Sequence, residues 1–244
     1  MEQIITRHRH ELKRRELTVA RAFHLTPHMV RIVLEGDDMA DFVSLAPDDH
    51  VKLLVPAGSE TVMREYTPRT FDARSLTLDF ALHEAGPATA WARAARPGDV
   101  LTVAGPRGSA VVAAAFDWWL LIGDETALPA MGRWAEELPE GRRLITLAAI
   151  PSEADRQSFA SRAAHEAHWC ERPLDQAADP APLIAAAQGL DLPEGRGFIW
   201  IAAEARVARA LRDHFAERGH PRHWMKAAGY WTKGIADGAD KALD

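Results

Sequence analysis

Cysteine and long apolar runs are nearly absent from this sequence, and both absences limit what the protein can be. Its 244 residues include a single cysteine, Cys170, which excludes an internal disulfide and a cysteine-ligated zinc or iron–sulfur centre. The longest apolar stretch, residues 110–122, contains Asp117 and is shorter than the ~20 residues that a membrane-spanning helix needs. We therefore expect no membrane association, and redox chemistry would require a bound cofactor.

The sequence also lacks an excess of positive charge and an apolar segment near its start. The formal net charge is −6, which argues against a nucleic-acid-binding protein. Residues 1–16 mix Arg, His, Lys and Glu without an apolar core, so we expect neither a signal peptide nor an anchor. We expect a cytoplasmic monomer, and we interpret the charged residues 7–15 as a solvated, mobile start.

One group of histidine and cysteine residues invites comparison with a metal site. His165, His168 and Cys170 lie close together in the sequence, but a fourth ligand is missing and the spacing fits none of the standard zinc patterns. We expect structural roles for these residues and no metal.

Length and patterning favour two domains, because 244 residues exceed the usual domain size of about 100–200 residues. In the first part, short β-type runs are separated by turn residues, at 29–34, 51–55, 76–82 and 100–103. Large apolar residues occupy every second position of residues 76–82, the period of a strand with one buried face. With one helix at about residues 87–95, this part predicts a small antiparallel β-barrel.

After Gly105-Pro106 the pattern changes to an alternation of strands and helices. Strands are predicted at 118–122, 144–150, around Trp169, at 197–203 and at 223–228, and helices at 126–138, 182–188 and 206–218. Such alternation predicts an α/β domain with a mostly parallel sheet. We place the domains at residues 1–113 and 114–244.

The segment Arg64-Glu65-Tyr66-Thr67-Pro68-Arg69 has the residue types that a flavin requires. In an extended strand Arg64 and Tyr66 share one face and Thr67 lies on the other. An arginine can pair with phosphate, an aromatic ring can lie against the isoalloxazine, and a hydroxyl can bind the flavin's polar edge. For the hexapeptide alone, an ordinary polar edge strand is the alternative.

A second segment, Gly86-Pro87-Ala88-Thr89, predicts the start of a helix, with a small residue before a first-turn proline. The unpaired amide groups of a helix N-terminus, together with the Thr89 hydroxyl, suit the pyrophosphate of a dinucleotide. A surface helix that merely begins with proline is the alternative.

These two segments, followed by Gly123-Asp124-Glu125-Thr126-Ala127-Leu128-Pro129-Ala130 and by Gly229-Tyr230-Trp231, resemble the siderophore-interacting protein family over essentially the whole chain. His83 and Lys52-Leu53-Leu54 belong to the same resemblance. It implies an N-terminal FAD-binding barrel and a C-terminal nicotinamide-binding α/β domain, as in the ferredoxin–NADP reductase-like superfamily.

The resemblance also implies which residues bind the cofactors. On the FAD side these are Arg64, Tyr66, Thr67, Arg69, His83, Gly86, Ala88 and Thr89, and in the α/β domain they are Gly123, Asp124, Glu125, Thr126, Glu204 and Trp231. Among them we interpret Asp124 and Thr126 mainly as turn and helix-cap residues. Ala203 stands where the family has glycine before the glutamate, which leaves open how closely nicotinamide can approach. No side chain is expected to act as acid, base or nucleophile.

Three cations match the basic set that lines the family's siderophore pocket, namely Lys52, Arg133 and Lys233. They would hold an anionic ferric siderophore by charge and hydrogen bonds without ligating the iron. The family often has a basic residue directly after Gly-Tyr-Trp, whereas this chain has Thr232 there. For each cation, a solvated surface charge is the alternative.

The resemblance therefore implies a ferric-siderophore reductase. FAD would accept hydride from NADH or NADPH and pass electrons to Fe(III), and the Fe(II) formed, which oxygen ligands hold less tightly, would be released in the cytoplasm. Three alternatives stay open: a general flavin reductase, a reductase fed by ferredoxin, and a non-catalytic protein that binds a ferric siderophore.

Overall fold

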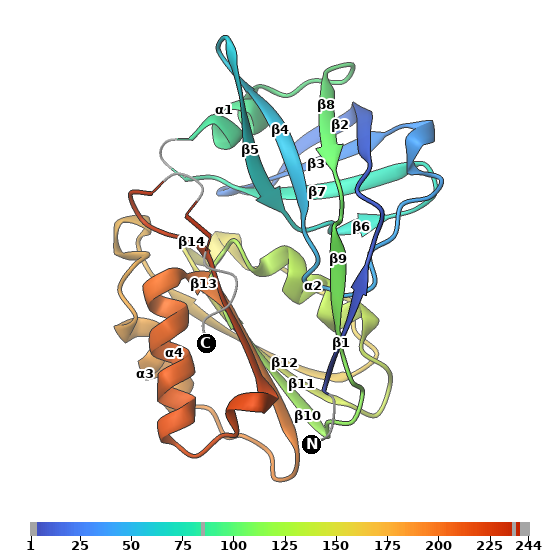
Figure 1. The fold of residues 1–244 in the computed structure, drawn as a ribbon. Coiled ribbons are helices and arrows are strands. Elements are labelled where there is room, and N and C mark those ends of the chain that lie inside the picture. The colour runs from blue at the N-terminus through green and yellow to red at the C-terminus, as the bar shows by residue number, and fades with distance from the viewer. Residues whose placement is uncertain (1–3, 84–85, 236–237, 240–244) are drawn as a thin grey trace. The chain divides into compact units, whose positions relative to one another are not determined.

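The computed structural model describes residues 4–83, 86–235 and 238–239. These residues form two compact units (Figure 1). The β unit consists of Ile5–Val112, and the α/β unit consists of the chain from Ala113 onward together with Ile4. No helix in the described ranges is both long enough and apolar enough to cross a membrane.

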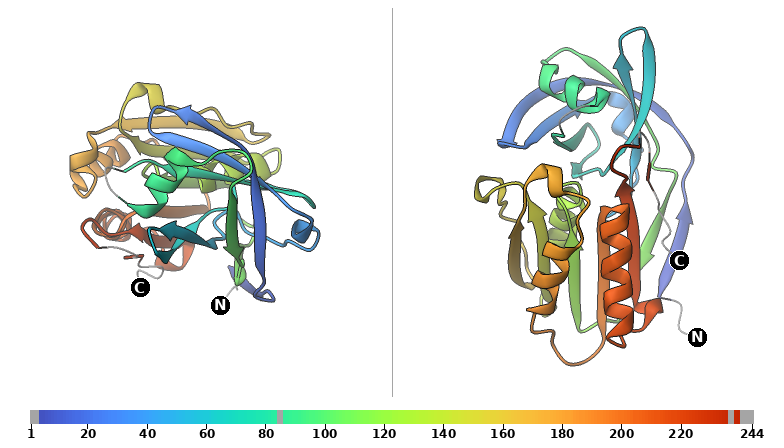
Figure 2. Two further views of the ribbon diagram at one scale, coloured as in Figure 1. Left: turned by 90° about the horizontal axis from the view of Figure 1, so that it is seen from above. Right: turned by 90° about the vertical axis from the view of Figure 1, so that its left-hand side faces the viewer.

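The β unit is built on a seven-stranded antiparallel sheet that curls on itself (Figure 2). The strand order is β5-β4-β8-β2-β3-β7-β6, and β1 and β9 form a separate antiparallel pair. This curled sheet, with its single α-helix, confirms the predicted antiparallel barrel. The elements are β1 (Ile5–Arg9), β2 (Arg14–Thr26), β3 (Met29–Glu35), β4 (Val51–Ala57), β5 (Glu60–Tyr66), β6 (Thr70–Phe71), β7 (Ser75–Ala81), α1 (Pro87–Ala94), β8 (Val100–Ala104) and β9 (Gly108–Val112).

Strand β7 shows where the sequence pattern was incomplete. Leu76, Leu78 and Phe80 are fully buried, as their alternation predicts. On the opposite face Thr77 and Asp79 are also buried. The Asp79 carboxylate accepts two hydrogen bonds of 2.7 Å from the guanidinium of Arg31, its cross-strand neighbour on β3. Because this bidentate pair satisfies the charge, the strand can be covered on both faces.

The expectation of a mobile start at residues 7–15 is wrong, although most of these residues are exposed to solvent, as expected. Most of these residues belong to β1 and β2, which pair with β9 and β8. Arg15 is buried, and it donates hydrogen bonds to the Asp41 carboxylate at 2.8 Å and to the carbonyl oxygens of Asp38 and Gly105 at 2.9 and 3.1 Å. These acceptors lie 23 to 90 residues away along the chain, so no local pattern signals them.

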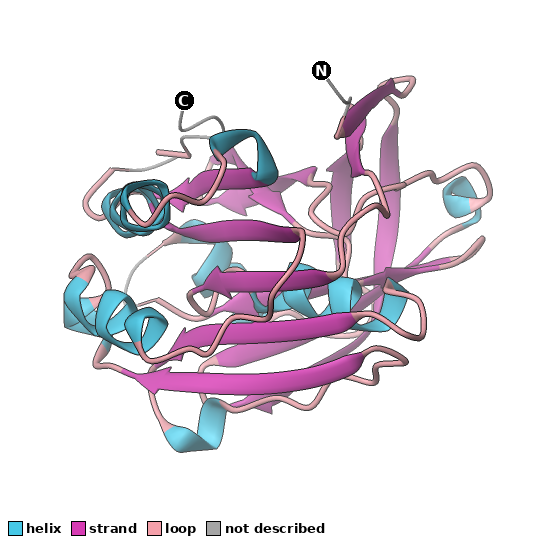
Figure 3. Cartoon of the chain, turned by 90° about the horizontal axis from the view of Figure 1, so that it is seen from below, coloured by secondary structure: helices cyan, strands magenta, loops and turns pink. Residues whose placement is uncertain are grey.

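The α/β unit is built on a five-stranded parallel sheet with the order β12-β11-β10-β13-β14, which confirms the predicted α/β class. The elements are β10 (Trp118–Gly123), α2 (Leu128–Glu137), β11 (Arg143–Ile150), β12 (Ala164–Glu171), α3 (Ala181–Gln188), β13 (Gly197–Glu204), α4 (Ala205–Glu217) and β14 (Met225–Trp231). Figure 3 shows these helices beside the strands.

Helices cover both faces of the parallel sheet. On one face, Val207 and Leu211 of α4 and Leu183 of α3 pack in a core with Leu120 and Ile199. On the other face, Trp119 lies 5.0 Å from the α2 residue Trp134, measured between ring centroids. Because both faces of the sheet centre are buried, β10, β11 and β13 read as nearly continuous apolar runs rather than alternating ones.

Candidate functional site

In the β unit, one aromatic cluster joins the two segments that the sequence analysis selected. The Tyr66 ring at the end of β5 lies 4.3 Å from the Phe80 ring of β7, with an interplanar angle of 38°. The Phe80 ring lies 5.7 Å from that of Trp91 in α1. The strand end and the helix therefore share one cluster. Burial raises the pKa of the Tyr66 phenol, so it stays protonated at neutral pH.

The polar residues around Tyr66 differ in how accessible they are. Arg64 is half-buried, and its Nη1 donates to the carbonyl of Met63 at 2.7 Å. Thr67 and Arg69 are buried, and the backbone N–H of Arg69 donates to the carbonyl of Thr77 at 2.9 Å. Arg64 and Tyr66 thus offer the more accessible surfaces, and the backbone of Arg69 is tied to β7.

Among the described residues, no side chain caps the N-terminus of α1. The first helical hydrogen bond runs from the Ala90 N–H to the Gly86 carbonyl at 2.9 Å. Pro87 has no N–H, so the amides of Ala88 and Thr89 lack acceptors within the helix. Because two such amides at the positive end of a helix dipole suit an anion, this donor set fits a dinucleotide pyrophosphate. His83, just before this turn, is half-buried.

The protein's own packing does not require glycine at position 86. Its φ of 168° is ordinary extended backbone, and a Cβ built there would meet no atom of the described residues within 4 Å. The space beside Gly86 is open to a ligand.

In the α/β unit, the order in which successive strands join the sheet reverses between β10 and β13, which lie side by side. From β10 it moves outward to β11 and β12, and then returns to β13 on the other side of β10. Open parallel sheets bind ligands outside the carboxyl ends of the strands at such a switch point. Asp124 follows β10 directly and Glu204 ends β13, so the predicted residues lie at this point.

Asp124 is 1% exposed, and its carboxylate accepts four hydrogen bonds. Oδ1 accepts from the N–H of Thr126 at 2.9 Å and from its hydroxyl at 2.5 Å. Oδ2 accepts from the N–H of Glu204 at 2.8 Å and from the indole Nε1 of Trp231 at 2.9 Å. Because the Asp124–Thr126 hydrogen bonds form a turn, α2 begins at Leu128 rather than at the predicted residue 126.

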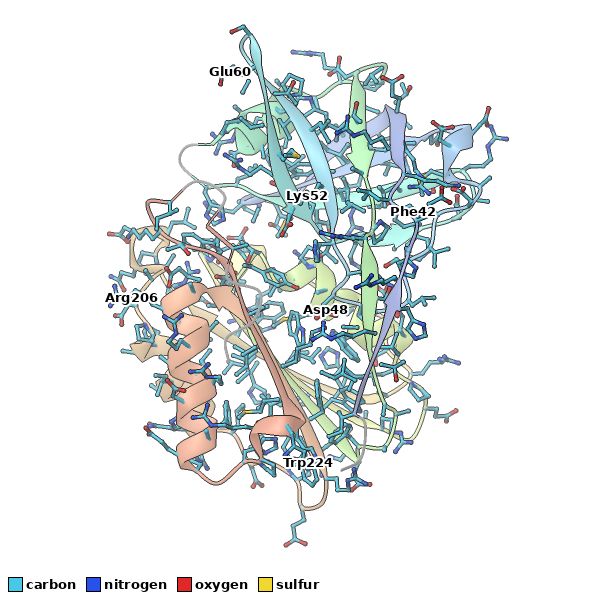
Figure 4. All side chains as sticks on the ribbon, viewed as in Figure 1. Phe42, Asp48, Lys52, Glu60, Arg206 and Trp224 are labelled. Carbon is cyan, nitrogen blue, oxygen red and sulfur yellow. The ribbon has the colours of Figure 1, made fainter. Side chains whose placement is uncertain are left out.

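Glu204 is also 1% exposed and caps α4. Its Oε2 accepts from the N–H groups of Arg206 and Val207 at 2.7 and 3.3 Å, and its Oε1 accepts from the N–H of Lys233 at 3.3 Å. Figure 4 labels Arg206 at the start of this helix. The positive end of the helix dipole favours a carboxylate here.

Glu125 forms a buried ion pair that the sequence analysis did not foresee. Its Oε2 lies 2.7 Å from Nη2 of Arg172, and each side chain is 4% exposed. Burial, followed by the nearby Asp124 charge, raises the pKa of Glu125 to about 7, while Arg172 opposes the shift. Arg172 directly follows β12. Its position after a predicted strand was the one signal that could have identified it.

Two small residues show how tightly the strand ends are packed. A Cβ added to Gly123 would lie 2.3 Å from the Ala202 carbonyl oxygen and 2.5 Å from the Ala127 Cβ, so glycine is required there. The methyl group of Ala203 is fully buried in the core that contains Val207 of α4. It is accommodated on the α4 face of the sheet.

The three candidate substrate-binding cations already have partners. Lys52 on β4 (Figure 4) is half-exposed, and its Nζ lies 3.7 Å from Oε1 of Glu65. Arg133 is buried on α2, and its Nε donates to the Glu137 carboxylate at 2.7 Å. The alternative interpretation of Arg133 as a solvated surface charge is therefore wrong. Lys233 is exposed, and its Nζ donates to the carbonyl of Asp175.

The histidines near Cys170 do not converge. His165 and His168 lie three residues apart on β12, so their side chains leave opposite faces of the strand. His165 Nε2 lies 2.9 Å from the Thr146 hydroxyl, and His168 Nε2 lies 2.7 Å from Glu166. In the described part of the chain, no group of three or more His, Cys, Asp or Glu side chains is arranged to hold a metal.

A curled antiparallel sheet followed by a parallel sheet of this order defines a two-domain fold, which is shared by the cytochrome b5 reductase domain of Ulva prolifera nitrate reductase (TM-score 0.63 at 15% identity, over 86% of this chain and 95% of that one). The chain belongs to the siderophore-interacting protein family, which confirms the resemblance. The family's siderophore-interacting FAD-binding domain matches residues 18–62 and 55–110, and its siderophore-interacting protein domain matches residues 116–234.

Several characterised relatives are similar over nearly the full length. The crystal structure of a siderophore utilization protein from T. fusca has a TM-score of 0.90 and 33% identity, covering 98% of this chain and 100% of that one. The NADPH-dependent ferric-chelate reductase of Escherichia coli (strain K12) is 32% identical over 91% of this chain and 94% of its own. The ferric vibriobactin reductase ViuB of Vibrio cholerae is 25% identical over 90% of each.

Proposed function

We propose that this protein is a ferric-siderophore reductase that binds FAD, takes hydride from NADPH or NADH, and reduces siderophore-bound Fe(III) to Fe(II). The observation that carries the proposal is the Tyr66–Phe80–Trp91 cluster, which joins the β5 strand end to the α1 helix. The names of the Escherichia coli and Vibrio cholerae relatives support the reaction and its substrate class.

FAD supplies the redox chemistry when bound, because a flavin accepts a hydride and can deliver electrons singly. We assign it to the domain of residues 1–113. The Tyr66 ring would lie against the isoalloxazine, and Arg64 would pair with a phosphate. The amides of Ala88 and Thr89, beside the open space at Gly86, would bind the pyrophosphate. Thr67, Arg69 and His83 complete the proposed FAD set.

We assign the nicotinamide cofactor to the domain of residues 114–244, outside the carboxyl ends of β10 and β13. The turn that begins at Gly123 packs too tightly for any larger residue, which keeps the backbone there fixed. Glu125, Thr126 and Trp231 border the same strand ends, and Trp231 supplies an aromatic surface. The family relation to an NADPH-dependent enzyme supports this assignment.

The ferric siderophore would be held by charge. Lys52 can exchange Glu65 for an anionic chelate at little cost, because its ion pair is long and half-exposed. Lys233 is also exposed and accessible. Arg133 differs: it is buried against Glu137, and separating a buried charge from its partner costs more. We therefore expect Lys52 and Lys233 to contribute most to substrate affinity.

Release of the metal follows from its chemistry, since Fe(II) is held less tightly than Fe(III) by hard oxygen ligands. We propose that this release takes place in the cytoplasm, the compartment that supplies reduced nicotinamide cofactors. Cell fractionation with an antibody against the chain would test the location.

The decisive experiment is an anaerobic spectrum of the purified protein with FAD, NADPH or NADH, a ferric siderophore and an Fe(II) chelator. Flavin bands that bleach and yield chelated Fe(II) would support the proposal. If only reduced ferredoxin, and neither nicotinamide cofactor, reduced the flavin, the electron donor would be ferredoxin. If the protein reduced free flavin but no ferric chelate, it would be a general flavin reductase. Failure to bind FAD after reconstitution would refute the proposal, and siderophore binding without flavin would indicate a binding protein.

A further inference from the structure

Two buried carboxylates bind residues at and just after the end of β14. Asp124 Oδ2 accepts a 2.9 Å hydrogen bond from the Trp231 indole, and Glu204 Oε1 accepts a 3.3 Å bond from the backbone N–H of Lys233. The same Asp124 oxygen binds the backbone of Glu204. The ends of β10, β13 and β14 are thus joined through two side chains that are each 1% exposed.

Strand β14 contains an irregularity at this place. It runs in regular register with β13 as far as the pair Ala203–Gly229, but the next pair is Glu204–Trp231, so Tyr230 is passed over. A bulge of this kind changes the face on which the following side chain emerges. Tyr230 packs 6.1 Å from Trp200, edge to face, and the bulge lets the Trp231 indole turn to Asp124 instead of leaving on the opposite face.

The hydrogen-bond capacity of these carboxylates is largely used within the α/β unit. A carboxylate has about four acceptor sites, and Asp124 receives bonds from Thr126 twice, from Glu204 and from Trp231. Glu204 receives three bonds, two of which cap α4. With 1% exposure, neither residue presents an accessible oxygen to a ribose hydroxyl.

We propose that Asp124 and Glu204 are positioning residues, which hold the Trp231 indole and the Lys233 backbone at the switch point and do not themselves contact the nicotinamide cofactor. This inference rests on the proposed function, in which Trp231 serves the cofactor and Lys233 the substrate. It assigns the two acidic residues a different role from the one that the family resemblance implies.

The test uses the FAD-loaded protein with ¹⁵N-labelled tryptophan, in which Trp231→Phe identifies the Trp231 indole N–H signal. Asp124→Ala should shift this signal and speed its exchange with D₂O by about tenfold to a hundredfold, because a bond to a charged acceptor is lost. Asp124→Asn should recover part of the protection, since its one oxygen can face Trp231 and Glu204. The Thr126 hydroxyl can turn to accept from the amide NH₂, but the backbone N–H of Thr126 loses its acceptor.

Asp117→Asn is the matched control. Asp117 precedes β10 at the amino end of the strand, and its carboxylate accepts from the N–H of Arg196 at 2.9 Å. Its loss should leave the Trp231 signal unchanged. Should Asp124→Ala not fold, Glu204→Gln gives a second test in protein labelled with ¹⁵N-lysine. The amide oxygen would cap α4 and its NH₂ would face the Lys233 backbone N–H, so the Lys233 amide should exchange faster.

Calorimetric titration with NADP⁺ and NAD⁺ completes the test. Asp124→Ala and Trp231→Phe should both weaken binding, and the double variant should weaken it no further than Asp124→Ala alone, because Asp124 acts through Trp231. An unchanged Trp231 signal in Asp124→Ala, unchanged affinity in both variants, or a further loss in the double variant would overturn the inference. The Trp231 signal needs no turnover, so a protein without reductase activity would refute the proposed function separately.

Discussion

Tyr66 is the residue whose replacement best tests the FAD side. Tyr66→Ala removes the ring that packs on Phe80, and we expect the dissociation constant of FAD to rise about tenfold or more. Tyr66→Phe keeps the ring and should keep the affinity. Phe71→Ala is the control, because Phe71 packs 5.0 Å from Phe42 in the same unit. FAD fluorescence titration measures all three, and equal losses in Tyr66→Ala and Phe71→Ala would contradict the assignment.

Glu125 makes stability depend on pH in an unusual direction. Burial raises its pKa in the folded protein from 4.5 to about 7, so between these values the folded state binds more protons than the unfolded state. The stability that this group contributes therefore falls by up to about 3 kcal/mol as the pH rises from about 4.5 to 7. Above pH 7 its contribution does not change further. Urea denaturation at pH 5 and pH 8 should show this loss in the wild type but not in Glu125→Gln, and equal pH dependence would refute it.

At the scale of elements, the uncapped N-terminus of α1 predicts a conflict between stability and binding. Gly86→Asp and Gly86→Asn can both cap the Ala88 and Thr89 amides, adding a few tenths of a kcal/mol to the FAD-free protein. Both caps compete with a pyrophosphate, and the aspartate also repels it. We expect FAD affinity to fall by about threefold to tenfold in Asn and further in Asp. Isothermal titration measures this, and wild-type affinity in Gly86→Asp would show that the pyrophosphate binds elsewhere.

Elements whose signals are local could be predicted, and elements fixed by distant partners could not. The apolar run of β10 and the Gly-Pro start of α1 were both identified within a residue of their observed bounds. Strand β14 was predicted to end at residue 228 but continues to Trp231, because its bulge is held by Asp124, 107 residues away. The start of α2 was misplaced because the Asp124 turn at Thr126 precedes it.

For the whole molecule, the change from strand runs to strand–helix alternation was enough to predict both architectures. The family resemblance then named candidate residues, but it could not supply their partners. Arg172 pairs with Glu125 from 47 residues away along the chain. Arg133 is buried and forms an ion pair with Glu137. A sequence pattern gives residue types at set spacings, whereas burial and pairing depend on which strands become neighbours.

The two cofactors should stabilise different units of the molecule, and this is the prediction that concerns the whole chain. A ligand at one hundred times its dissociation constant adds about 2.7 kcal/mol to any opening that destroys its site. Hydrogen exchange followed by mass spectrometry should therefore show FAD slowing exchange within Ile5–Val112, most strongly at β5, β7 and α1. NADP⁺, or NAD⁺ if that is the donor's oxidised form, should slow exchange at the carboxyl ends of β10 and β13. Protection by FAD confined to the α/β unit would reverse the assignment of cofactors to domains, because a ligand protects the unit whose unfolding releases it.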